Sequence, residues 1–348
     1  MRRNYRKIVK KILCPFFVSL FCFFIVFIIF DSNFSKIWAS DDKLTVFVSI
    51  LPQKFFVEQI GKDRVDVQVM VEPGASPHTY EPKPQQMIAL SKTDIYFAIG
   101  LSFEKVWLDK ISATNKNMKI VNTDDGIEKI QMVGHNHHEE DNDVEHKFTE
   151  TKSAKNDKEQ NLNQKQELEP DLHEEHKHKG EHKEHKGEPD PHIWLSPKLV
   201  IIQANHILKG LKSIDPQSGA FYDANYKTFI LKIEKIDKDL KDIFRDKKGV
   251  KFMVFHPSWG YFARDYNLQE IPIEKEGKNP RPAELQELIN HAREDKILVI
   301  FVQPQFSAKS AKQIAREING EVVFADPLAY DWFKNLIEVA DKFKSALK

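Results

Sequence analysis

Cysteine is almost absent from this chain of 348 residues. Its two cysteines, Cys14 and Cys22, both lie within the first 40 residues, in a segment that has the pattern of an export signal. The chain beyond residue 40 can therefore form no disulfide bond, although an oxidising compartment outside the cytoplasm would permit one. Its stability has to come from buried apolar surface, and a chain of about 300 residues is long enough for two domains.

The chain also lacks an excess of positive charge beyond its N-terminus. Basic and acidic residues number 52 each, so the formal net charge is zero. Seven basic residues and one acid (Asp31) fall within residues 1–40, which leaves 45 basic and 51 acidic residues, a net charge of −6, in residues 41–348. Nucleic acid is bound mainly by positive charge. We therefore expect no nucleic-acid partner.

Residues 1–40 have the composition of an export signal. Residues 2–11 contain six basic residues and no acid, and residues 12–30 are almost entirely apolar. Ala39 provides a cleavage site before Ser40. The apolar run is also long enough to span a bilayer uncleaved. The segment is thus predicted to be a signal peptide or an N-terminal anchor, and either places the rest of the chain outside the cytoplasmic membrane.

Beyond residue 40 the pattern is that of an α/β protein with two lobes. Short β-branched runs alternate with helical patterns in two blocks, residues 41–214 and residues 250–348. The predicted strands occupy residues 44–50, 65–71, 94–100, 251–256, 296–303 and 321–325.

Residues 215–249, between the two blocks, are predicted to form one long helix. Asp215 fits an N-cap, Pro216 fits the first helical position, and Gly249 fits a stop. A helix of about 30 residues spans roughly 45 Å, which is longer than one small lobe needs. The sequence therefore predicts two α/β lobes joined by a long rigid helix. Apolar residues recur along it at spacings of three and four: Phe221, Tyr222, Tyr226, Phe229, Ile233, Ile236, Leu240 and Phe244.

Residues 134–190 interrupt the first lobe with a segment rich in histidine and charge. Because it has too few apolar residues to offset the entropy of ordering, we expect a disordered insertion. Clustered imidazoles bind zinc, copper or nickel loosely, so the composition also predicts weak metal binding. The insertion holds nine of the 14 histidines: His135, His137, His138, His146, His173, His176, His178, His182 and His185.

Five histidines lie outside the insertion, and three of them share an unusual context. His78, His192 and His256 each follow or precede a proline in a loop near a predicted strand or helix end. Ligand sites in α/β sheets gather in loops at the strand ends. His206 and His291 instead lie within helical patterns, where a lone histidine is usually a surface or packing residue.

Asp326 has the same context as the three loop histidines, since it directly follows a predicted strand and precedes Pro327. Three imidazoles and one carboxylate from two lobes would suit Zn²⁺ in the interlobe cleft, whereas Mn²⁺ favours more oxygen ligands. Because no pair of these residues lies in a short motif such as HExxH, their spacing leaves open that they are unrelated loop residues.

Four stretches of the chain resemble the zinc ABC-transporter solute-binding proteins, of the class whose lobes are joined by a rigid helix. The resemblance runs from about Leu44 to the C-terminus and includes the acidic, histidine-rich insertion. The matching stretches are "PGASPHTYEPKPQQM" (73–87), "DPHIWLSP" (190–197), "FHPSWGYFARDYNL" (255–268) and "ADPLA" (325–329).

The resemblance implies zinc bound by His78, His192 and His256, with Asp326 or a water molecule in the fourth position. Some zinc-binding members place a glutamate before the first histidine, but this chain has Pro77 there. Manganese and iron members carry a carboxylate at the third position, where this chain has His256, so zinc is favoured over manganese.

The resemblance further implies a monomer that captures Zn²⁺ outside the cytoplasmic membrane and delivers it to a membrane permease. Two other functions remain open. A zinc hydrolase would need a general base beside a zinc-bound water, and the site motifs offer only Glu81. A surface protein that sequesters metal without a transporter would fit the same residues.

Overall fold

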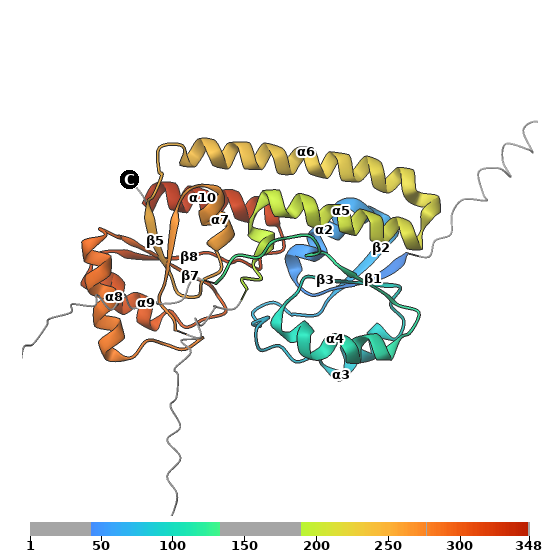
Figure 1. The fold of residues 1–348 in the computed structure, drawn as a ribbon, viewed down its shortest axis with the longest axis horizontal. Coiled ribbons are helices and arrows are strands. Elements are labelled where there is room, and N and C mark those ends of the chain that lie inside the picture. The colour runs from blue at the N-terminus through green and yellow to red at the C-terminus, as the bar shows by residue number, and fades with distance from the viewer. Residues whose placement is uncertain (1–42, 133–188, 276, 347–348) are drawn as a thin grey trace, which may run out of the picture.

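The computed structural model describes residues 43–132, 189–275 and 277–346. In these ranges the chain forms two α/β lobes side by side, with a long helix running along both (Figure 1). The segment 1–40 and residues 134–188 of the insertion lie outside them, so the predictions of an export signal and of a disordered histidine-rich segment stay predictions. The last two residues assigned to the insertion, Pro189 and Asp190, are ordered, so its predicted end was two residues too late. No helix in the described ranges is long and apolar enough to cross a membrane.

The first lobe is built on a four-stranded parallel sheet with the order β2-β1-β3-β4. Its central strands are short apolar runs, and every residue of β3 is buried, as is typical of parallel sheets covered on both faces. Helices α2 and α5 lie between the sheet and the long helix, while α3 and α4 lie on its other side (Figure 1). The elements are β1 (Leu44–Val48), α2 (Leu51–Gly61), β2 (Val65–Val69), α3 (Pro84–Leu90), β3 (Ile95–Ala98), α4 (Ser102–Thr114), β4 (Lys119–Asn122) and α5 (Pro197–Ile214).

The second lobe repeats this sheet. Its four parallel strands have the order β6-β5-β7-β8, so both sheets place their second strand at one edge and their first strand beside it. Helices α7 and α10 face the long helix, and α8 and α9 cover the opposite side (Figure 1). The elements are β5 (Lys251–Val254), α7 (Gly260–Asp265), β6 (Gln269–Pro272), α8 (Pro282–Glu294), β7 (Val299–Val302), α9 (Lys309–Glu317), β8 (Glu321–Phe324) and α10 (Trp332–Ala346).

The long helix is shorter than its sequence pattern predicts. Asp215 does cap a helical segment, but that segment is the 3-10 turn η3 (Pro216–Ser218). The Asp215 side chain accepts the backbone N–H of Ser218, the last residue of this turn. The α-helix proper is α6 (Gly219–Phe244), 26 residues or roughly 39 Å. It ends five residues before Gly249, whose φ of +74° suits the turn into β5.

Helix α6 packs against both lobes through its buried aromatic residues. Phe229 contacts Phe55 of α2, and Phe244 contacts Phe343 of α10. A second connection lies nearer the cleft, where the Trp194 indole N–H donates to the carbonyl of Pro327 and the Trp332 indole N–H donates to the carbonyl of Trp194. The larger apolar core is therefore continuous across both lobes. The loops between the lobes pack against this core.

Candidate metal centre

His192 precedes the 3-10 turn η2 (Ile193–Leu195) that leads into α5, and the residues on either side of it fix its position. Asp190 lies two residues earlier, and its Oδ1 accepts the His192 backbone N–H at 2.9 Å and lies 2.7 Å from the ring Nδ1. The Trp194 ring packs against the imidazole with centroids 5.1 Å apart. Because a carboxylate only accepts hydrogen bonds, the ring holds its proton on Nδ1 and presents a bare Nε2 to the cleft.

His256 is held in the same way at the end of β5 in the second lobe. Its Nδ1 lies 2.6 Å from Oε1 of Glu274, and the Phe306 ring stacks on the imidazole at 4.9 Å. The Gln303 side chain accepts the His256 backbone N–H at 3.3 Å. His256 Nε2 is thereby directed into the cleft, as for His192.

His78 comes from the first lobe, on the Pro/Gly-rich loop between β2 and α3. Gly74 in this loop has a φ of +81°, which glycine adopts without strain. The His78 backbone N–H donates to Oγ of Ser76 at 3.3 Å, and the ring is only partly buried. Among the hydrogen bonds of the described residues, none joins a carboxylate to the His78 ring.

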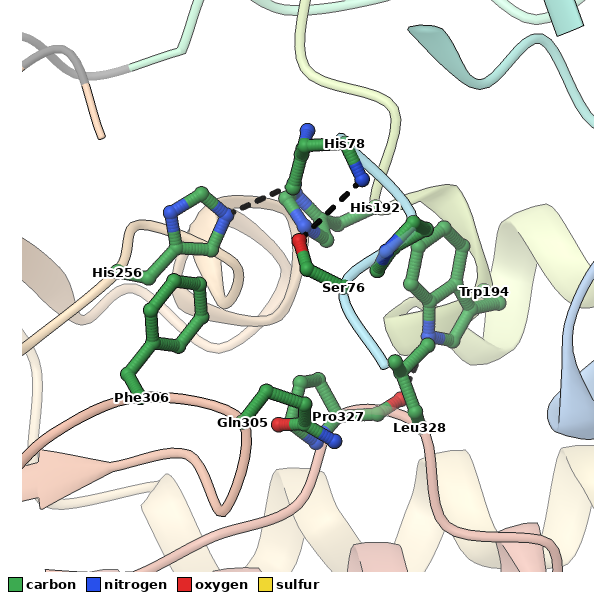
Figure 2. A pocket seen from close by; sticks show the side chains of 10 residues that line it. Ser76, His78, His192, Trp194, His256, Gln305, Phe306, Pro327 and Leu328 are labelled. Atoms are coloured by element: carbon green, nitrogen blue, oxygen red, sulfur yellow. Dashed lines mark hydrogen bonds between the residues drawn. The ribbon is translucent and has the colours of Figure 1, made fainter. Parts of the chain in front are cut away.

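The three imidazoles meet at one point in the cleft (Figure 2). One ring nitrogen from each of His78, His192 and His256 can be chosen so that all three lie within 4.8 Å of one another. Nε2 of His78 and Nε2 of His256 are 3.0 Å apart. The pocket around them is lined by apolar and uncharged residues, including Trp194 and Phe306.

The electrostatics of the pocket favour neutral imidazoles. Burial, together with the nearby His192 and His256 rings, lowers the pKa of His78 to about 3. Burial also lowers the pKa of His192, against the opposing effect of Asp190. These two rings are unprotonated at neutral pH and are therefore ready to act as nitrogen ligands.

Asp326, the predicted fourth ligand, is not part of this group of metal-ligand atoms in the structure. Its Oδ1 accepts the side-chain N–H of Gln305 at 2.9 Å and the backbone N–H of Leu328 at 3.0 Å. Both bonds lie within the loops of its own lobe, so the carboxylate is oriented by its neighbours. The structure thus brings together the three histidines and leaves the aspartate outside their group.

The remaining sequence candidates lie away from the centre. His206 donates to the carbonyl of Asp125 at 3.0 Å, and His291 is exposed on α8, which agrees with the packing and surface roles predicted for them. Glu81, the general base that a hydrolase would need, is exposed and outside the group of metal-ligand atoms.

Asp190 and Glu274 are site residues that the sequence patterns did not identify. Asp190 was visible inside the "DPHIWLSP" stretch, two residues before the histidine. Glu274 had no local signal, because it lies 18 residues from His256.

Comparison with known proteins agrees with this architecture. The family model for zinc-uptake complex component A, periplasmic (ZnuA), matches residues 46–346. A crystal structure of ZnuA matches with a TM-score of 0.71 and 40% sequence identity, and the match covers 88% of this chain and 100% of that chain.

Two curated relatives differ in the metal that their names give. Zinc-binding protein AdcA of Streptococcus pyogenes serotype M3 is 25% identical over 307 residues, which are 87% of this chain and 54% of AdcA. This chain thus spans about half the length of that relative. The manganese ABC transporter substrate-binding lipoprotein scaA of Streptococcus gordonii is 25% identical over 333 residues, 91% of each chain. Because the family model and the matching structure both cover most of the chain, this protein belongs to the ZnuA family of solute-binding proteins of metal ABC transporters.

Proposed function

We propose that this protein binds one Zn²⁺ through His78, His192 and His256 outside the cytoplasmic membrane and delivers it to the permease of an ABC importer. The observation that supports this most is the convergence of three buried or partly buried imidazoles from two lobes. Three neutral nitrogen ligands with one open position are a common zinc arrangement. In this proposal zinc is cargo and the protein acts as a monomer.

Manganese is the second candidate, because the relative scaA is named for it. The donor set argues against it. Mn²⁺ prefers carboxylate, carbonyl and water oxygens, whereas imidazole nitrogen suits Zn²⁺. Asp326, the carboxylate predicted as a fourth ligand, is held by Gln305 and Leu328.

Metal analysis of the purified protein, followed by titration with a competing chelator, tests the proposal. We expect one tight zinc equivalent at the cleft. Alanine at His78, His192 or His256 should each lower zinc affinity by at least about tenfold, since each change removes a ligand. His206→Ala and His291→Ala are matched controls and should change nothing. If His206→Ala weakens zinc as much as His192→Ala does, the assignment is wrong.

The histidine-rich insertion can be tested separately from the cleft. Gln131 and Pro189 form an antiparallel bridge at its base, so a chain lacking residues 135–187 can be closed by a short linker. We expect this variant to keep the tight site and to lose additional weaker zinc equivalents, because gathering ligands from a segment that is predicted to be disordered costs ordering entropy. Calorimetry would contradict this if the folded variant lost the tight site.

Delivery to a permease requires a test in cells. A strain without this protein should grow poorly only when a chelator makes zinc scarce, and added zinc should restore growth. Removal of residues 2–30 should leave the protein in the cytoplasm and give the same phenotype, since that segment is predicted to direct export. Normal zinc uptake in the deletion strain would argue instead for sequestration without transport.

A further inference from the structure

Two buried carboxylates lie directly behind two of the three cleft histidines. Asp190 is 2% exposed and Glu274 is 6% exposed. Each touches the Nδ1 of one imidazole, His192 at 2.7 Å and His256 at 2.6 Å. Neither carboxylate is close enough to a metal at Nε2 to act as a ligand, because a whole imidazole ring lies between.

The pair of Glu274 and His256 follows from the register between strands β5 and β6. Strands β5 and β6 are parallel, with Val254 opposite Pro272. Two residues further along, the same register places Glu274 opposite His256, and the Glu274 backbone N–H still donates to the carbonyl of Phe255 at 3.0 Å. Glu274 is therefore held by the extended ladder of the sheet.

Asp190 is held from two sides. Its backbone N–H donates to the carbonyl of Ile130 at 2.8 Å, and its own carbonyl accepts the Tyr261 hydroxyl at 2.8 Å. That hydroxyl also accepts the Ile130 backbone N–H at 3.2 Å. The base of the insertion and the second lobe thus fix the backbone that carries the carboxylate.

Neither carboxylate is balanced by a basic side chain. Among the described residues, the ion pairs of Asp190 and Glu274 are with His192 and His256 alone. A buried charge without a compensating cation is costly. A divalent cation bound at the far side of the two rings would supply the missing positive charge.

We propose that Asp190 and Glu274 are positioning residues that determine metal affinity by fixing the Nδ1–H tautomer of His192 and His256 and by supplying the two negative charges that balance a dication. With three neutral imidazoles, the metal and the two carboxylates together carry no net charge. Hydrogen bonding of a ligating imidazole to a carboxylate also raises the basicity of its free nitrogen. This inference depends on the proposed zinc site.

His78 has no such partner, and this gives it a different role. His256 accepts at Nε2 because its proton is held on Nδ1 by Glu274. The His78 Nε2 lies 3.0 Å away, so in the metal-free protein His78 carries its proton there and donates to His256. Metal binding therefore requires a tautomer change at His78 alone, while the other two ligands are already set.

Two kinds of substitution separate the effect of the carboxylate charge on zinc affinity from the effect of imidazole orientation. Asp190→Asn and Glu274→Gln keep an oxygen that can accept the Nδ1–H but remove the negative charge. Asp190→Ala and Glu274→Ala remove both. We expect zinc affinity to fall roughly tenfold or more in the amide variants and further in the alanine variants. Asp124→Asn is the matched control, because this carboxylate follows β4 in the first lobe and pairs with Lys129 rather than with an imidazole.

Nitrogen-detected NMR of the zinc-free protein, with labelled histidine, supplies a readout that a purely structural role would not move. His192 and His256 should show the Nδ1–H tautomer in the wild type and in the amide variants, and a mixture in the alanine variants. Circular dichroism identifies any variant that fails to fold, and the two carboxylates serve as independent tests.

The outcomes distinguish this inference from the proposed function. If the wild type binds no zinc, the function itself fails. If it binds zinc tightly and His256→Ala abolishes binding, but Asp190→Asn and Glu274→Gln stay within about threefold of the wild type, the carboxylates do not set affinity. An unchanged tautomer in both alanine variants would likewise overturn the orienting role.

Discussion

The two lobes have sheets of the same strand order but hold their histidines differently. In the second lobe, His256 lies two residues after β5 and is paired with Glu274, which lies two residues after the neighbouring strand β6. In the first lobe, His78 follows β2 after nine residues and lies on a loop. The distance from the strand end decides which ligand the sheet can orient. Of the two ligands that follow strands, His256 of the second lobe is therefore preset and His78 of the first lobe is adjustable, while His192 of the first lobe is preset by Asp190.

The largest expected difference concerns the stability of the zinc-free protein. His256→Ala leaves Glu274 buried without the imidazole that accompanies it, and its Oε2 already has no hydrogen-bond partner. Breaking one side of a buried pair typically costs about 3 kcal/mol. His78→Ala leaves no carboxylate unpaired and should cost less than about 1 kcal/mol.

Chemical denaturation of both variants in the presence of a chelator measures this difference. A second substitution, Glu274→Leu, should restore much of the stability lost in His256→Ala, because it removes the uncompensated charge. Equal losses in His78→Ala and His256→Ala would contradict the contrast between the lobes.

The next difference concerns one buried glutamate in each lobe. Glu104 in the first lobe accepts the backbone N–H groups of Ile99, Gly100 and Leu101. Glu104→Gln places an N–H₂ against one or more of these donors and should cost about 2 kcal/mol at pH 7. Urea denaturation at several pH values checks this, and a loss confined to alkaline pH would contradict it.

Glu270 in the second lobe should respond in the opposite direction. Its Oε1 accepts the Trp259 backbone N–H at 2.8 Å, and its Oε2 has no hydrogen-bond partner. Burial, assisted by the nearby Asp190, raises the pKa of Glu270 to about 8. A raised folded-state pKa means stability that is complete below the unfolded value near 4.5 and is lost as pH rises through 8. Glu270→Gln cannot ionise, so it should raise the melting temperature by a few degrees at pH 8 and not at pH 5.

Much of the architecture could be predicted from the sequence. Six of the eight strands in the described ranges were recognisable, because parallel strands buried on both faces are continuous apolar runs, as in β3 and β7. The edge strands β4 and β6 were not predicted. The two-lobe plan was confirmed, and α6 was placed correctly except at its ends. Its start was misplaced because Asp215 and Pro216 begin a 3-10 turn with the same capping residues as an α-helix.

The site was only partly predictable. The three histidines were recognisable from their proline-flanked loops, whereas Asp326 shares that context without joining them. Context at a strand end does not determine where a short side chain finds its hydrogen bonds. Glu274 could not be recognised because its place beside His256 depends on the register of β5 and β6, which no local pattern reveals.

A smaller effect is expected from the pH dependence of the zinc-free protein. The pKa of His78 is lowered to about 3, mainly by burial, while an unfolded histidine titrates near 6.5. The unfolded chain therefore binds the proton more readily, and stability falls as the pH decreases from 6.5 towards 3. At pH 5 this amounts to about 2 kcal/mol for one such group.

The variant His78→Gln should make this dependence shallower. Thermal unfolding of the wild type and the variant between pH 7 and pH 5, with chelator present, measures the two slopes. His291→Gln, a change on the exposed face of α8, is the control and should leave the slope as it is. Parallel slopes in His78→Gln and the wild type would show that His78 titrates normally.

The smallest expected effect concerns the aspartates that follow the last strand of each sheet. Asp124 lies two residues after β4 and pairs with Lys129 at 2.6 Å, and Asp326 lies two residues after β8 and accepts from Gln305 at 2.9 Å. Each is engaged within its own lobe, Asp124 by an ion pair and Asp326 by two hydrogen bonds. Because Asn keeps the oxygen that accepts from Gln305 and Leu328, Asp326→Asn should change zinc affinity by less than about threefold, with water completing the coordination. Competition titration against a chelator measures this, and Asp124→Asn is the matched control. A tenfold or larger loss in Asp326→Asn alone would show that the carboxylate leaves Gln305 to bind the metal, so that each lobe contributes two ligands.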